Sequence, residues 1–268
     1  APDGATIYVM SDVEMNQMAW VWEKELTITS YGVDPVTLSR GENFHTNADP
    51  ARQRYNPAMI EVGGETEQGT VSSLILTHII LDDMGKYEGE YFVQADSEGD
   101  GETTVSRSEV PNTSIVQDAI IATYNGMGTI TLGDGAELRN YGGMSAVRLS
   151  GGELIMEEGS AILDTTENER EKGASGSFGP AGAVWLQGGI LTMNGGTIGG
   201  DKGVMMNGRA LYADGGTANI GGTIQNIHGT DVAWQGQNGV AVHLRSHGEA
   251  TLASTGEITL SLIHISEP

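Results

Sequence analysis

The chain has 268 residues, with 13 Lys or Arg against 36 Asp or Glu, so its formal net charge is −23 at pH 7. Such a charge repels polyanions at every approach, which excludes nucleic acid as an expected partner. The absence of cysteine excludes disulfides and thiolate metal sites, and no run reaches the ~18 apolar residues of a membrane span.

Short β-rich runs predict strands throughout the first third of the chain, because apolar and polar residues alternate or β-branched residues dominate. These runs are Ala5–Val9, Leu26–Ser30, Val36–Leu38, Met59–Val62 and Leu74–Leu81. One stretch, Met18–Lys24, is instead interpreted as a helical turn. Its apolar residues would cover the open end of the strands that follow.

From residue 118 onward the predicted strands follow a repeat. A first unit consists of Asp118–Ala122, Ile130–Leu132 and Ala136–Leu138. A common frame then returns four times, as AVRLSGGELIM at Ala146–Met156, AVWLQGGILTM at Ala183–Met193, ALYADGGTANI at Ala210–Ile220 and AVHLRSHGEATL at Ala241–Leu252. Each frame holds two short strands around a turn. A third strand begins further on, at Ile162, Ile198, Ile224 or Ile258.

The frames are about 37, 27 and 31 residues apart, a period typical of stacked solenoids. Glycine accounts for 40 of the 268 residues and would supply the sharp corners, because it has no Cβ and readily adopts positive φ. Strands of successive coils would pair about 4.8 Å apart. The sequence therefore predicts an all-β fold, a single parallel β-helix with three short strands per coil, over residues 1–259.

Four insertions interrupt the predicted coils: Gly41–Pro57, Lys86–Pro111, Asp164–Pro180 and His228–Gly239. In solenoids such loops, or one lateral face, commonly carry function.

The last nine residues, Leu260–Pro268, read LSLIHISEP, which matches the translation of a common sequencing-library adaptor. We expect residues 260–268 to be an adaptor-derived tail outside the fold, and the chain to be a fragment of a larger protein.

Several segments resemble a known family, among them TIYVMSD, KELTITS, YNPAMIEV, SSLILTHIILDD, VQDAIIA, GTITLGDGAELRNYGGMSAVRLSGGELIMEEGSAILDTT and GAVWLQGGILTMNGGTI. They are similar to the pectin-lyase-like right-handed β-helix segments in large adhesin-like surface proteins of Gram-positive gut bacteria. The resemblance implies an extracellular, cell-surface or cell-wall location. It is informative about fold and uninformative about activity.

Enzymes of this fold cleave polysaccharides with clustered carboxylates, so a lyase or hydrolase with a divergent site is the alternative function. Asp82 and Asp83 are the adjacent aspartates that close a predicted strand. Because successive strand side chains point to opposite faces, the two carboxylates would not simply act together. The other interpretation is that they accept hydrogen bonds from backbone amides at a corner.

Residues Asp96, Glu98 and Asp100 form the opening of a loop similar to a Ca²⁺-binding EF-hand. Position twelve is Arg107 rather than the bidentate Glu, so we expect a solvated acidic loop, with Ca²⁺ as the alternative cofactor.

The repeat register also predicts that Val147, Val184, Leu211 and Val242 point inward. The residues that follow each of them would then form an outward-facing column, here named the outer column. It consists of Arg148, Trp185, Tyr212 and His243. An exposed line of such residues would suit binding to host or microbial glycans or to a surface protein. The alternative is that the insertions cover Trp185 and Tyr212. The leading expectation is thus a non-enzymatic adhesive or structural module, and the sequence leaves its oligomeric state open.

Overall fold

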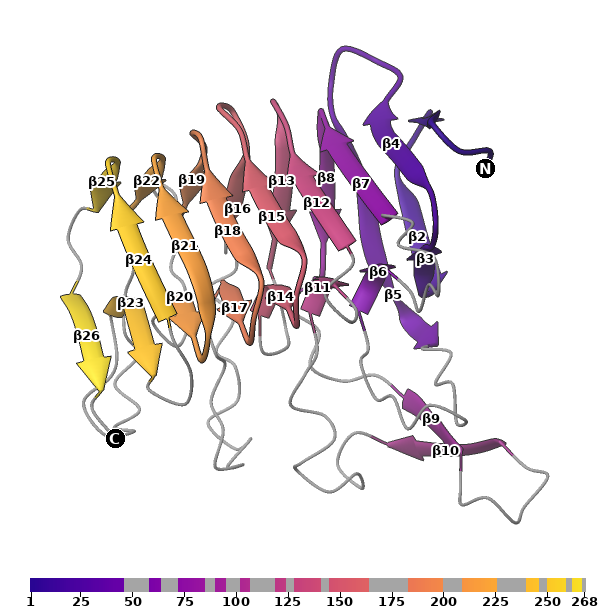
Figure 1. Ribbon diagram of the computed structural model, residues 1–268. Coiled ribbons are helices and arrows are strands. Elements are labelled where there is room, and N and C mark those ends of the chain that lie inside the picture. Colours follow the sequence, from indigo (N-terminus) through magenta and orange to yellow (C-terminus); the bar gives the residue numbers. More distant parts are fainter. Residues whose placement is uncertain are drawn as a thin grey trace.

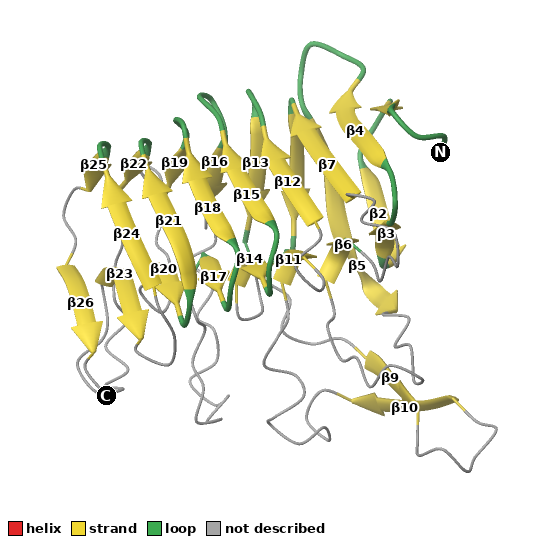
Figure 2. Ribbon diagram, in the orientation of Figure 1, coloured by secondary structure: helices red, strands yellow, loops and turns green. Residues whose placement is uncertain are grey.

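A computed structural model describes residues 1–45, 58–63, 72–84, 90–94, 102–106, 119–123, 128–140, 145–163, 183–199, 209–225, 240–245, 250–258 and 262–266. The secondary structure within these ranges consists of strands, with no helix (Figure 2). Twenty-four strands form three parallel eight-stranded sheets, here named A, B and C, and two further strands form an antiparallel pair.

The strands of each sheet follow one another along the stack in Figure 1. The N-terminal end of the stack consists of β1, β2 and β3, and the other end consists of β24, β25 and β26. Sheet A consists of β1 (Ala5–Val9), β4 (Glu25–Ser30), β7 (Ser72–Thr77), β12 (Gly128–Leu132), β15 (Glu153–Met156), β18 (Ile190–Met193), β21 (Gly216–Ile220) and β24 (Ala250–Ser254). Sheet B consists of β2 (Val13–Gln17), β5 (Val36–His45), β8 (Ile79–Asp82), β13 (Ala136–Arg139), β16 (Ala161–Leu163), β19 (Thr197–Ile198), β22 (Thr223–Ile224) and β25 (Glu257–Ile258). Sheet C consists of β3 (Ala19–Val21), β6 (Ala58–Val62), β11 (Ala119–Thr123), β14 (Ser145–Leu149), β17 (Val184–Leu186), β20 (Arg209–Ala213), β23 (Val240–Arg245) and β26 (Leu262–Ser266).

The chain visits sheets A, B and C in a fixed order, and each strand pairs in parallel with its counterpart in the next round. One round of three strands is called a coil below. Between β8 and β11 the chain forms the antiparallel pair β9 (Glu90–Gln94) and β10 (Glu102–Ser106). This pair belongs to none of the three sheets and lies below the stack in Figure 1, with β9 in contact with β5. This topology is consistent with a solenoid, and it confirms the predicted all-β class and the three strands per coil.

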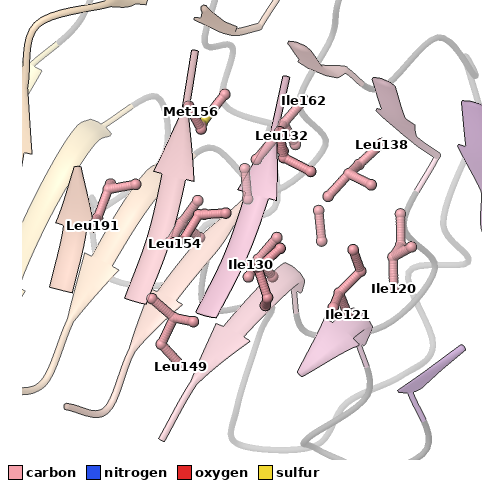
Figure 3. Packing of buried hydrophobic residues seen from close by; sticks show 14 of the residues in the cluster. Ile120, Ile121, Ile130, Leu132, Leu138, Leu149, Leu154, Met156, Ile162 and Leu191 are labelled. Carbon is pink, nitrogen blue, oxygen red and sulfur yellow. The ribbon is translucent and has the colours of Figure 1, made fainter. Parts of the chain in front are cut away.

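The core lies between the three sheets and is built from aligned apolar side chains. Along sheet A, Leu74, Ile130, Leu154 and Leu191 occupy one register position. In Figure 3, Ile130 and Leu154 point into the same interior as Leu138 of sheet B and Ile121 of sheet C. All of these side chains are buried. Each coil therefore covers the apolar residues of the coils on either side.

Glycine makes the corners possible where backbones of successive coils approach closely. Gly152, just before β15, has φ +72°, and a Cβ at this position would overlap the carbonyl oxygen of Gly128 in the preceding coil. An L-residue is therefore opposed there both by its backbone conformation and by contact with the neighbouring coil.

At both ends of the chain, a strand forms where the sequence predicts none. The expected helical turn at Met18–Lys24 is wrong, because Ala19–Val21 forms β3 and pairs in parallel with β6. The neighbouring strand supplies partners for this short apolar segment, and Val21 becomes buried. Residues Leu262–Ser266, expected to lie outside the fold, form β26 and pair with β23; this pairing does not bear on the origin of residues 260–268.

Candidate functional site

The outer column has the alignment that the repeat predicts. Val147, Val184, Leu211 and Val242 are successive partners in sheet C, and so are the residues that follow each of them. These following residues are Arg148, Trp185, Tyr212 and His243.

Burial of the outer column is the main difference from the expected exposed binding face. Its four residues are only 2% to 8% exposed, so the structure favours the alternative interpretation, in which these residues are covered, over an exposed line. Trp185 and Tyr212 have ring centroids 6.5 Å apart, and Tyr212 and His243 meet edge to face at 5.1 Å. The Trp185 indole N–H also donates to the Asp214 carboxylate at 3.4 Å. These contacts make the column a packed stack rather than an open platform.

The same register position continues toward the N-terminus. Trp20 on β3 aligns with Glu61 on β6, which aligns with Ala122 on β11 and then with Arg148. Glu61 is buried, whereas Trp20 is 48% exposed. Sequence reasoning missed Glu61, although a single carboxylate within the apolar run AMIEV was a visible signal.

The two candidate catalytic aspartates lie at the end of β8 and have different surroundings. Asp82 is partly exposed; it accepts hydrogen bonds from the Met84 amide at 2.7 Å and from the Asn140 side-chain amide at 3.0 Å. Asp83 is fully buried. Their different burial agrees with the expectation that adjacent side chains would not act as one pair.

Asp83 forms a buried ion pair with Arg40 of β5, one coil earlier. The Arg40 guanidinium also donates to the Ala119 carbonyl oxygen at 3.2 Å and lies 4.5 Å from the centre of the Phe44 ring. Arg40 thus connects the end of β8 with the start of β11, across the long segment that contains β9 and β10. Because the buried charge of Arg40 has both an ion-pair partner and a carbonyl acceptor, we interpret Arg40 and Asp83 as residues with a structural role.

The proposed Ca²⁺ residues Asp96, Glu98 and Asp100 lie outside the described residues. Within the ranges that the structure describes, no three His, Cys, Asp or Glu side chains are grouped so that they could hold a metal ion. The same part of the chain contains no helix with the length and hydropathy needed to cross a membrane.

Comparisons with protein-family models, with curated proteins and with solved structures find no match for this chain.

Proposed function

We propose that the chain is a non-enzymatic structural segment of a secreted or cell-surface protein, built as a single right-handed parallel β-helix of the pectin-lyase-like kind. The observation that carries this proposal is the continuous register of the three sheets, in which each strand pairs with the next round without a change of order. Strands hydrogen-bonded on both sides and packed on an apolar core resist bending, so the segment acts as a rigid spacer.

The surroundings of the candidate catalytic residues support a structural role over the alternative of a polysaccharide lyase or hydrolase. Asp83 is buried against Arg40, and Asp82 is engaged with a corner amide and Asn140. A general acid or base must reach its substrate, which a fully buried carboxylate does not do.

The outer column has a packing role in this proposal. Its burial removes the contact area that sugar rings would need, so glycan stacking on Trp185 and Tyr212 is not supported. The extracellular location is what the family resemblance implies, and the absence of cysteine is compatible with it.

Distance measurement between two spin labels tests the rigid-spacer proposal, and a chain without cysteine can be labelled at chosen sites. Thr6 and Asn219 are exposed and occupy one register position of sheet A, on its first and seventh strands. In T6C/N219C, six steps of about 4.8 Å predict a backbone separation of about 29 Å with a narrow distribution. A broad distribution extending well beyond this value would refute a rigid spacer.

Incubation with polygalacturonate and xylan tests the non-enzymatic part of the proposal. No release of reducing ends or unsaturated products is expected. Cleavage that is lost in Asp82→Asn but retained in the neighbouring-coil variant Glu137→Gln would establish the alternative instead.

A further inference from the structure

We propose that Asn194 is a site of spontaneous chemical modification, at which its side-chain amide is converted to a carboxylate and the contact between two coils is thereby weakened. The site lies at the corner between β18 and β19, where Asn194 is followed by Gly195. The inference rests on the geometry of this corner and is independent of the proposed spacer role.

The fold requires glycine directly after Asn194. A Cβ at Gly195 would lie 2.8 Å from the backbone nitrogen of Glu158 in the preceding coil, closer than real Cβ atoms come to such an atom. Because glycine has no side chain, the backbone nitrogen of Gly195 is also the least hindered nitrogen that could attack the Asn194 side chain. Asn194 is exposed, so water reaches its amide. Packing therefore retains a chemically labile pair at this corner.

The reaction needs water as its only co-reactant. The backbone nitrogen of Gly195 loses its proton and attacks the side-chain carbonyl carbon of Asn194. A C–N bond forms and closes a succinimide ring, the bond from that carbon to Nδ2 breaks, and Nδ2 leaves as ammonia with the proton. Water then opens the ring at either carbonyl, which gives aspartate or isoaspartate. The net change replaces an amide with a carboxylate and releases ammonia.

Contacts with the preceding coil hold both reacting groups of the folded chain. The Gly195 N–H donates to the Met156 carbonyl oxygen at 3.2 Å, which opposes the loss of its proton. The Asn194 side-chain amide donates to Glu157 Oε1 at 2.9 Å. This bond fixes the leaving nitrogen and places a negative charge near the anionic nitrogen that must form. The closed corner therefore slows the reaction, and local opening of the corner speeds it.

The product is unfavourable here because of the charges that the corner already carries. The corners between sheets A and B in four successive coils are residues 133–135, 157–160, 194–196 and 221–222. They contain Asp134, Glu157 and Glu158 and no Lys, Arg or His. A carboxylate at residue 194 loses the hydrogen bond to Glu157 and repels it across neighbouring coils. Isoaspartate also lengthens the backbone where the coils leave no room for a Cβ.

Peptide mapping by mass spectrometry, with the folded chain kept in mildly alkaline buffer, tests the site. Conversion raises the mass of the Asn194 peptide by one unit. It should proceed at least about tenfold more slowly than in the isolated peptide Ile190–Gly199. Fragmentation must assign the change to Asn194, because Asn125, Asn207 and Asn238 also precede glycine.

Two variants separate the effect of Glu157 from that of carboxylate loss in general. Glu157→Gln should speed conversion about threefold, because it removes the charge that opposes the anionic nitrogen. Glu153→Gln is the matched control and should leave the rate unchanged. Glu153 lies on β15, directly before this corner in the preceding coil, and accepts a hydrogen bond from Thr192 rather than from Asn194.

Asn194→Asp tests the consequence, since it reproduces the aspartate product directly. At neutral pH its unfolding midpoint should lie about 2–4 °C below that of the unmodified chain. Asn194→Asp/Glu157→Gln should recover part of this loss, because only one of the two carboxylates remains.

Three results would overturn the proposal: conversion at Asn194 as fast as in the peptide, no conversion over about a hundred half-lives of the peptide, or an Asn194→Asp chain as stable as the unmodified one. Far-UV circular dichroism shows whether each variant is folded.

Discussion

At the scale of single residues, the Arg40–Asp83 pair is the clearest structural use of charge in this acidic chain. Both side chains are almost completely buried. We predict that Arg40→Met lowers the free energy of unfolding by about 3–5 kcal/mol, because Asp83 is left as a buried charge without its ion-pair partner. Urea titration of the variant measures this loss.

The double variant Arg40→Met/Asp83→Leu is the control for that experiment, since it removes both charges and keeps apolar volume in place. It should lose less stability than Arg40→Met alone. A single variant within about 0.5 kcal/mol of the unmodified chain would show that the pair contributes little.

Trp185 and Trp20 occupy one register position in sheet C and differ in burial, so they form a matched pair. Trp185→Ala should cost about 3–5 kcal/mol of unfolding free energy, because it leaves a cavity beside Tyr212. Trp20→Ala should cost about 1 kcal/mol or less, because its side chain is half exposed. Urea titrations at one low protein concentration make the comparison, and equal losses would contradict a buried outer column.

At the scale of elements, the corners depend on glycine where a neighbouring backbone leaves no room for a side chain. Gly152→Ala should destabilise the chain by at least about 2 kcal/mol, because of its positive φ and the overlap with Gly128. Gly32→Ala is the control, since a Cβ at Gly32 meets nothing nearer than 3.9 Å and its φ lies outside the left-handed region. Thermal unfolding of both variants shows whether the loss of stability is specific to the corner at Gly152 or accompanies the replacement of glycine in general.

The strand register of the second half could be predicted from the sequence, because the repeated frame fixes which residues align. Val147, Val184 and Leu211 follow the frame directly and are paired as expected. Burial of the outer column could not be predicted in the same way. A register gives the direction of a side chain and carries no information about what covers it.

The Arg40–Asp83 pair was missed for a different reason. The early coils have no common frame, so the alignment of Leu38 with Leu81 was not apparent. That alignment, extended by two residues, would have placed Arg40 beside Asp83. Leu74–Leu81 likewise reads as one apolar run, whereas the structure divides it at His78, which has φ 48° and forms the corner between β7 and β8.

At the scale of the whole molecule, a stack in which each coil contacts only its neighbours has a stability that varies along its axis. Interior coils are covered on both sides, whereas the first coil is covered on one side only. Local opening should therefore require less free energy at the end than in the interior. Several large apolar residues of the first coil are exposed for the same reason, because this coil is covered on one side only.

Native-state hydrogen exchange measures that difference directly. Amides of β12, β15 and β18 should exchange only through global unfolding, whereas those of β1 and β2 should open with a free energy at least about 2 kcal/mol lower. Equal protection in all coils would instead mean that the stack unfolds as one cooperative unit, in which end and interior are equally stable.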